Sequence, residues 1–326
     1  MTGQELALAI DDARWPVALT SDYTGGDRTL LALYRKCEAQ HWDADRDIDW
    51  AVPLDPANPL KIPDDAMELQ GTELWRRIGA AERDRIRHHL QAWRLSQILH
   101  GEQAGMLCAA KMVAGATELA TKLFAAGQMA DEARHVDVYS RLLRTHFSAI
   151  YPLDPSLGTL LDQVLRDPRH DMINLGVQIM VEGIALASFR RIHAYSQEAF
   201  VKTLIAYVVK DEARHFAAGR LMFRAHARQF SEAERAEREE FICEAALRLR
   251  DHLFAREVWT LLGLPANECA QILRGSQNMR NIHRSLFRQL VPAIREAGLL
   301  GGRAVKVFEE LGVIEYASFP LSDFEA

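Results

Sequence analysis

The sequence has few cysteines and no long uninterrupted apolar run. The four cysteines among 326 residues are Cys37, Cys108, Cys243 and Cys269. No two of them lie close enough in sequence to indicate a zinc site, a redox pair or an iron–sulfur cluster. Scattered thiols of this kind are typical of reduced, buried residues in a cytoplasmic protein. No stretch approaches the roughly 18 to 20 apolar residues that a membrane-spanning helix requires.

Two further absences narrow the location and the partners. Met1 to Asp12 contains no basic segment followed by an apolar one, so we expect no export signal and a cytoplasmic protein. The formal net charge is −6, which argues against nucleic acid or a membrane surface as a main partner. Apolar residues make up 48 % and charged residues 26 % of the chain, as in ordinary globular proteins.

The pattern of apolar residues predicts an all-α fold. Strand signals are nearly absent, and a 3.6-residue period dominates from Gly71 onward. A helix is expected from Asp27 to about His41, followed by a proline-rich loop that excludes a helix. We expect an N-terminal helix and cover segment over residues 1–70, a four-helix bundle over 71–230 and C-terminal packing helices over 231–326. Together they would form one compact domain.

Four long helices are predicted for the bundle, over about residues 81–113, 117–147, 171–194 and 197–228. Prolines at 152, 155 and 168 mark a long crossover between the second and third helices, with a short helix over 157–165. In the C-terminal segment we expect helices over about residues 231–252, 256–262, 265–298 and 303–311.

A five-residue motif, Asp-Glu-Ala-Arg-His, occurs twice, at Asp131–His135 and at Asp211–His215. Within each copy a Glu precedes a His by three positions, which places both side chains on one face of a helix, one turn apart. A further Glu lies thirty residues before each motif Glu: Glu102 in the first half and Glu182 in the second. In an antiparallel hairpin each leg would be roughly 20 Å long, so both glutamates would reach the same height.

Two such hairpins predict a dimetal site in the centre of the bundle. Its six ligands would be Glu102, Glu132, His135, Glu182, Glu212 and His215. Four carboxylates neutralise two divalent ions, and carboxylates mixed with imidazoles suit iron or manganese. A single Glu-x-x-His pair would be a surface coincidence. Two identical copies, each following a Glu on an apolar helix where an unpaired carboxylate is costly, favour metal binding.

The other polar residues of the motif are expected to support the histidines. A metal-bound imidazole usually donates its free N–H to a carboxylate. By the approximate twofold symmetry, Asp211 would serve His135 and Asp131 would serve His215. The arginines that would pair with these aspartates, or alternatively face solvent, are Arg134 and Arg214.

Tyr139 follows His135 by four residues and shares its helical face. It would carry an oxidising equivalent, donate a hydrogen bond or, as the favoured interpretation, fill the core. The corresponding position in the second half is Gly219, where we expect open space. Small residues at 105, 109, 110 and 183 are expected to leave further room for a substrate near the metals.

Over about Ala81 to Arg228 the chain resembles the ferritin-like di-iron carboxylate superfamily, and in particular its oxygen-activating branch. That branch includes multicomponent monooxygenase hydroxylases, ribonucleotide reductase small subunits, acyl-carrier desaturases and arylamine N-oxygenases. The resemblance implies that the six ligands bind two iron ions, with a manganese–iron pair as the alternative, and that the reduced pair reacts with O2.

The sequence departs from the pattern of several of these relatives. Leu186 stands where the hydroxylases carry a threonine, and Val208 stands where the arylamine N-oxygenases carry an additional histidine. Tyr139 matches the radical tyrosine of the reductase small subunits, but Glu102 stands where those subunits usually have Asp.

We therefore expect a di-iron monooxygenase that uses O2 and two electrons to oxygenate a small organic substrate, at a C–H bond or an amine nitrogen. No Gly-rich nucleotide fingerprint follows a strand, so a separate reductase or ferredoxin would supply the electrons. We also expect a homodimer. The alternatives are a reductase-like tyrosyl-radical or Mn/Fe oxidase, an acyl desaturase and, in a different class, a ferritin-like iron-storage or peroxide-scavenging protein.

Overall fold

The computed structural model describes residues 17–321 except residues 24, 25 and 148. The described residues form helices joined by turns and loops, and no strand occurs among them. The predicted all-α fold is therefore confirmed. The first sixteen residues, in which we expected no export signal, lie outside the described part of the chain.

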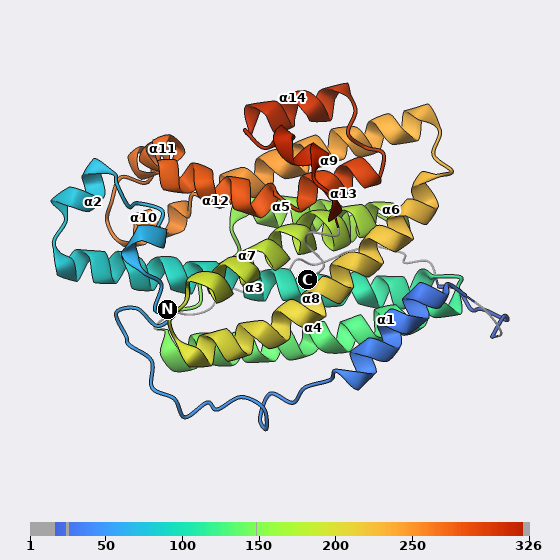
Figure 1. The fold of residues 1–326 in the computed structure, drawn as a ribbon, viewed down its shortest axis with the longest axis horizontal. Coiled ribbons are helices and arrows are strands. Elements are labelled where there is room, and N and C mark those ends of the chain that lie inside the picture. Colours follow the sequence, from blue (N-terminus) through green and yellow to red (C-terminus); the bar gives the residue numbers. More distant parts are fainter. Residues whose placement is uncertain (1–16, 24–25, 148, 322–326) are drawn as a thin grey trace.

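Four helical segments form the bundle, and each begins and ends within a few residues of its predicted bounds. They are α3 (Ala80–Gly115), α4 (Leu119–His146), the run of α6 (His170–Ile173), η2 (Asn174–Val181) and α7 (Glu182–Tyr195), and α8 (Ala199–Ala227). The crossover contains α5 (Pro155–Arg166), whose first turn is capped by the Asp154 carboxylate. In Figure 1 the four long segments lie side by side, with α3 against α4 and α7 against α8.

The third segment is not the uniform α-helix that the sequence predicts. Its middle, η2, has the wider π-helical turn, and all eight of its residues are buried. Such turns are rare and often occur at functional sites; this one ends directly before Glu182. The whole run, His170–Tyr195, is long and apolar enough to cross a membrane, but 83 % of its most apolar window is buried inside the structure. It is the core helix of this bundle.

The segment before α3 lies against the bundle. α1 (Arg28–Ala39), blue in Figure 1, packs on α4 and α8 and begins at Asp27, whose carboxylate accepts two backbone N–H bonds. The proline-rich loop that follows has no helix until η1 (Asp64–Ala66), and α2 (Glu73–Arg77) precedes α3. Leu60 and Met67 of this segment are buried in the main core.

The C-terminal helices pack on one side of the bundle (orange and red in Figure 1). α9 (Glu232–His252) begins with a capping box formed by Ser231 and Glu234. The predicted single helix over residues 265–298 is wrong, because Ser276 stops one helix and caps the next. The helices that follow α9 are α10 (Arg256–Leu261), α11 (Ala266–Gly275), α12 (Gln277–Phe287), α13 (Leu290–Glu296), α14 (Gly302–Glu310) and η3 (Ile314–Ser318).

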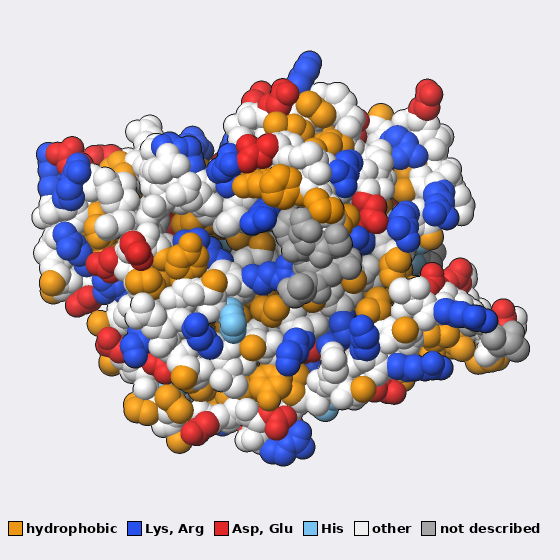
Figure 2. Space-filling model, in the orientation of Figure 1, with side chains coloured by type: hydrophobic (Ala, Val, Ile, Leu, Met, Phe, Trp, Pro, Cys, Tyr) orange, Lys and Arg blue, Asp and Glu red, His pale blue; other side chains and the backbone are white. Residues whose placement is uncertain are grey.

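The surface carries charges of both signs. On the face drawn in Figure 2, Lys and Arg side chains are interspersed with Asp and Glu side chains and with apolar ones. Nucleic-acid-binding surfaces instead concentrate positive charge in a patch or stripe.

Candidate metal centre

The six predicted ligands meet in the middle of the bundle. Glu102 is on α3, Glu132 and His135 are on α4, Glu182 is the first residue of α7, and Glu212 and His215 are on α8. All six side chains are buried, with exposures between 0 % and 6 %. Each of the four segments thus contributes at least one ionisable side chain to one enclosed volume.

The six side chains form two overlapping groups of four. Within each group, one nitrogen or oxygen atom of every residue lies within 4.8 Å of those of the others. The groups are Glu102, Glu132, His135 and Glu212, and Glu132, Glu182, Glu212 and His215. Glu132 and Glu212 belong to both groups, whereas Glu102 and Glu182 belong to one group each. If each group held one ion, Glu132 and Glu212 would be the residues shared by both ions.

Both imidazoles turn Nδ1 towards the carboxylates. In His135, Nδ1 lies 2.9 Å from Glu212 Oε1 and 3.2 Å from Glu102 Oε2. In His215, Nδ1 lies 3.2 Å from Glu132 Oε1 and 3.4 Å from Glu212 Oε2. The ring atoms available to bind an ion therefore point at the shared centre of the two groups.

The other ring nitrogen of each histidine meets an aspartate from the opposite hairpin. Nε2 of His135 lies 3.1 Å from Asp211 Oδ2, and Nε2 of His215 lies 3.3 Å from Asp131 Oδ2. An imidazole that donates Nε2–H to a carboxylate presents an unprotonated Nδ1 lone pair to a metal.

The two motif arginines join both aspartates in one buried cluster. Arg134 pairs with Asp131 and lies 3.1 Å from Asp211, while Arg214 pairs with Asp211 and lies 3.3 Å from Asp131. The arginine side chains are only 8 % and 6 % exposed. Solvent-facing arginines, the alternative from the sequence, are therefore excluded.

The crowded charges shift several pKa values. Burial raises the pKa of Glu102 and Glu182, and the nearby Glu212 carboxylate raises both further. Burial lowers the pKa of His135 and His215, but neighbouring carboxylates outweigh it and leave both well above the ordinary value. A bound cation would neutralise part of the negative charge that these buried carboxylates carry when ionised.

The donor set fits two metal ions. Several of its buried atoms make no well-oriented hydrogen bond in the described part of the protein, although other atoms of the same donor set lie near them: Glu132 Oε2, both oxygens of Glu212 and His215 Nδ1. Orphaned buried polar atoms are costly, and these all face the same centre. Four carboxylates and two imidazoles are also a ligand set that iron and manganese accept.

One family model matches most of the chain. It is described as p-aminobenzoate N-oxygenase AurF, and it covers residues 24–298. The chain belongs to the AurF family. This is a ferritin-like family of non-haem di-iron oxygenases, so the chain is an oxidoreductase of that class. No curated protein matches the chain.

Trp42, which was not among the predicted site residues, contacts Asp211 beside the candidate metal centre. The indole Nε1–H of Trp42 donates a 2.8 Å hydrogen bond to Asp211 Oδ2, the oxygen that also meets His135. The Trp42 ring stacks on Tyr207, with ring centroids 5.0 Å apart, and lies beneath the Arg134 guanidinium. Trp42 is 169 residues from Asp211, so no spacing rule identifies this contact.

Tyr139 is buried beside the ligands of the AurF-family centre. Its hydroxyl has no hydrogen-bond partner in the described structure, and its ring stacks on Phe189 with centroids 5.8 Å apart. The open space expected at Gly219 is absent. A Cβ added there would lie 2.6 Å from the Gln178 Cβ, because the side chain of η2 fills that volume.

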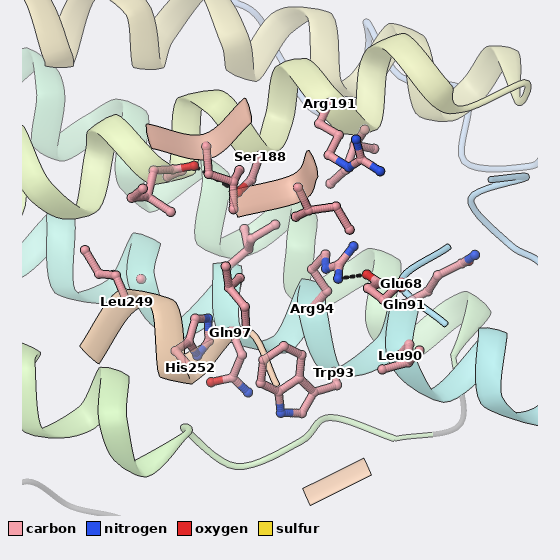
Figure 3. A pocket seen from close by; sticks show the side chains of 18 of the residues that line it. Glu68, Leu90, Gln91, Trp93, Arg94, Gln97, Ser188, Arg191, Leu249 and His252 are labelled. Carbon is pink, nitrogen blue, oxygen red and sulfur yellow. Dashed lines mark hydrogen bonds and ion pairs between the residues drawn. The ribbon is translucent and has the colours of Figure 1, made fainter. Parts of the chain in front are cut away.

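Two of the small residues that were expected to leave room for a substrate, Gly105 and Gly183, are packed against other side chains. Added Cβ atoms at Gly105 and Gly183 would lie 3.0 Å from the Glu132 carboxylate and 3.1 Å from Phe216. Those glycines therefore make room for protein atoms. A cavity of about 110 Å³ reaches Glu102 and Glu182. It lies between α3 and α7, with walls completed by residues 60–68 and by α9 and α12 (Figure 3).

Proposed function

We propose that this chain binds two iron ions at the candidate metal centre and oxygenates the nitrogen of a small aromatic amine. The observation that carries this proposal is the pair of four-residue groups that share Glu132 and Glu212. The AurF-family match over residues 24–298 supports it. The proposed ligands are Glu102, Glu132, His135, Glu182, Glu212 and His215.

The bound irons would supply the activation of O2 and its transfer to the substrate. The protein's own side chains would fix the centre around them. Asp211 and Asp131 would orient the imidazoles by accepting Nε2–H, while Arg134 and Arg214 hold these aspartates in place. Burial of every ligand excludes bulk water from the reacting centre.

The substrate would occupy the cavity that ends at Glu102 and Glu182. Its walls are mostly apolar, as expected for a site that binds an aromatic ring. The family description names p-aminobenzoate, so an aminobenzoate-like amine is the first substrate class to test. The family description also favours an amine nitrogen over a C–H bond as the site of oxygenation, and an oxygenase over an iron-storage or peroxide-scavenging protein. The buried Val208 stands where the arylamine N-oxygenases carry an additional histidine. Because valine cannot bind a metal ion, we propose a centre with two imidazoles rather than three.

The electrons would come from another protein. No strand occurs in residues 17–321 as far as they are described, so that part offers no strand–turn–helix site for a nucleotide. We propose a reductase or a ferredoxin as the donor, and two irons rather than a manganese–iron pair. The homodimer and the cytoplasmic location stay predictions.

Iron loading under anaerobic conditions, followed by metal analysis and turnover with an aminobenzoate under ¹⁸O2, tests the proposal. We expect about two irons per chain and ¹⁸O on the substrate nitrogen. Glu132→Ala should lose both, whereas Glu310→Ala, on the exposed side of α14, should behave as the unchanged protein. Iron content unaffected by Glu132→Ala would refute the ligand assignment, and peroxide consumption without organic product would favour a scavenger.

A further inference from the structure

Residues 62–68, which we call the strap, border two separate spaces. On one side is the cavity beside the metal centre, and the strap residues that line it are Ile62, Ala66, Met67 and Glu68. On the other side is an open surface hollow of about 430 Å³, which Pro63 and Asp65 line. Tyr195 at the end of α7 lines both spaces. The partition between the cavity and the hollow is therefore this short stretch of chain together with Tyr195.

Two ion pairs attach the strap to α3. Arg87 pairs with Asp64, and Arg94 pairs with Glu68 at the margin of the cavity (Figure 3). The Asp64 side chain is 45 % exposed, so water can replace its partner when the strap moves. The Glu68 side chain is 3 % exposed and would gain hydration on moving outwards. Neither ion pair therefore strongly opposes a displacement of the strap.

Hydrogen bonds to the strap backbone come from two further helices. Arg191 of α7 donates a 2.9 Å hydrogen bond to the backbone oxygen of Ala66. Asn278 of α12 donates two, each 2.9 Å long, to the backbone oxygens of Asp65 and Met67. Because these donors are side chains, they can release the strap without disturbing the helices that carry them. A segment paired through its own backbone ladder would instead leave many backbone groups unpaired.

The strap lies between two residues with left-handed backbone conformations. Lys61 has a φ of 48° and Gly71 has a φ of 81°. A positive φ strains a non-glycine residue, and such strain often marks segments that move. The chain directly before Lys61 is fixed. The Leu60 N–H donates to Gln91 Oε1 at 3.0 Å, and the Leu60 oxygen accepts a 2.7 Å hydrogen bond from Ser196. Lys61 therefore stands at the junction of an anchored segment and a releasable one.

The other walls of the cavity cannot move aside as easily. α3 and α7 carry proposed metal ligands and bury many further side chains in the core. Parting them would open the environment of Glu102 and Glu182, which are only 6 % and 5 % exposed. The strap contains no helix beyond the three residues of η1. Displacing the strap therefore breaks fewer contacts than displacing either long helix.

We propose that the strap is a gate: it moves away from α7, with Lys61 and Gly71 as its pivots, and opens the cavity to the surface hollow. In the closed position Ala66 and Met67 complete the apolar wall of the cavity. In the open position a small aromatic molecule passes from solvent to the space beside the metal centre. Hinges of this kind are a few loop residues that absorb the change in backbone angles. Such a gate controls access alone, so it goes beyond the proposed reaction and does not depend on it.

Modification of a cysteine placed inside the cavity tests the gate. Ser188 of α7 lines the cavity (Figure 3), and Ser188→Cys replaces only its side-chain oxygen by sulfur. The reagent is 4,4′-dithiodipyridine, a neutral aromatic disulfide that releases a coloured thiopyridone. The native cysteines are buried, and mass spectrometry confirms that the introduced thiol alone is modified. We expect a rate at least about 10-fold below that of free glutathione, because the reagent must wait for the strap to open.

Variants that weaken the contacts of the strap should speed the modification. In the Ser188→Cys background, Asn278→Ala removes two hydrogen bonds and should raise the rate about 10-fold. Asp64→Asn weakens a partly exposed ion pair and should raise the rate about threefold. Neither Asn278 nor Asp64 is among the residues that line the described cavity. The intrinsic reactivity of the introduced thiol therefore stays the same.

Two matched controls lie outside the strap. Asn281→Ala removes an amide from the same helix α12, where it accepts a hydrogen bond from Gln277. Asp45→Asn weakens an ion pair between the N-terminal segment and Arg141 of α4. Both control variants should react at the rate of Ser188→Cys alone. Circular dichroism on every variant confirms that the helices remain formed.

Three results would overturn the gate. A thiol that reacts as fast as glutathione in Ser188→Cys protein would show that the cavity is open without any movement. Equal rates in the strap variants and the control variants would show that the strap does not control access. A thiol that stays unreactive in every variant would show that no aromatic molecule enters by this route. Because no turnover is measured, the gate and the proposed oxygenation can fail independently of each other.

Discussion

The first hairpin, α3 with α4, and the second hairpin, from α6 to α8, supply the same set of ligands but surround them differently. Glu102 lies within a continuous 36-residue α-helix, whereas Glu182 directly follows the π-helix η2. The repeated motif thus preserves the six ligand types while the backbone that presents them has diverged. The twofold symmetry holds for the six proposed ligands and for the Asp–Arg cluster beside the histidines, but not for the backbone that presents Glu102 and Glu182.

The two carboxylates that belong to both groups show the same divergence. Glu132 Oε1 accepts a 3.0 Å hydrogen bond from Gln128, one turn earlier, and Gln128 exchanges hydrogen bonds with Gln178 of η2. The residue one turn before Glu212 is the buried Val208, whose side chain has no group that could donate the matching hydrogen bond to Glu212. Glu132 and Glu212 therefore have chemically distinct surroundings.

The largest expected effect comes from removing a shared ligand. Glu132→Ala and Glu212→Ala should each bind almost no iron, because each carboxylate belongs to both groups. Glu102→Ala and Glu182→Ala should retain about one iron per chain, since each faces one ion position. Metal analysis after anaerobic loading measures the difference. Equal iron content in all four variants would show that no carboxylate bridges.

A smaller effect is expected from the aspartates that meet the histidines. Asp131→Asn and Asp211→Asn should weaken iron affinity by roughly 10- to 100-fold while keeping the helical fold. Asp211→Asn should have the larger effect, because Asp211 also accepts the Trp42 hydrogen bond. Iron titration with a competing chelator gives the affinities. Unchanged affinity in either variant would mean that its aspartate does not support the metal.

Tyr139 and Gly219 occupy equivalent positions, and substitutions there should differ in sign. Gly219→Ala should lower the free energy of unfolding by about 1–3 kcal/mol, since the new Cβ meets Gln178 at 2.6 Å. Tyr139→Phe should be neutral or slightly stabilising, because it removes a buried hydroxyl without a partner in the described structure. Denaturant unfolding of metal-free protein measures both. Strong destabilisation by Tyr139→Phe would reveal a partner for the hydroxyl.

The smallest expected effect comes from Trp42, which donates a hydrogen bond to the same Asp211 oxygen that meets His135. Trp42→Phe keeps an aromatic ring against Tyr207 and removes the hydrogen bond to Asp211. Loss of this hydrogen bond should reduce the free energy of iron binding by about 1 kcal/mol. The matched control is Trp50→Phe, whose indole donates to the backbone oxygen of Ala44 instead. Iron affinity should fall in Trp42→Phe and stay constant in the control. Identical affinities would separate Trp42 from the metal centre.

Sequence reasoning predicted what depends on local pattern. The four bundle segments followed from the 3.6-residue period, and the clustering of the ligands followed from the repeated motif and the thirty-residue spacing. The π-helical turn of η2 was not predicted, since a mostly apolar segment of eight residues has no period that distinguishes a π-helix from an α-helix. The break at Ser276 was missed because its capping hydrogen bond, from the Met279 N–H, is visible only in the structure.

The cavity could not be predicted because distant segments build it. Glu68 from the N-terminal loop, Arg191 from α7 and Leu286 from α12 line the same space, although more than ninety residues separate each from the next. The small residues near the ligands did not indicate this cavity, since a glycine leaves room equally well for a substrate or for a neighbouring side chain. The packing of the neighbouring side chains in the folded structure determines which of the two occupies that space.

The buried thiol of Cys108 lies close to the proposed metal centre, so its susceptibility to oxidation matters. Cys108 lies on α3, fully enclosed, and burial raises the pKa of its thiol, with the nearby Glu132 carboxylate acting in the same direction. Oxidants attack the thiolate far more readily than the thiol. The sulfur is therefore held mainly as the less reactive thiol, beside the proposed metal centre. If the centre activates O2 as proposed, this placement would slow oxidation of Cys108 during turnover.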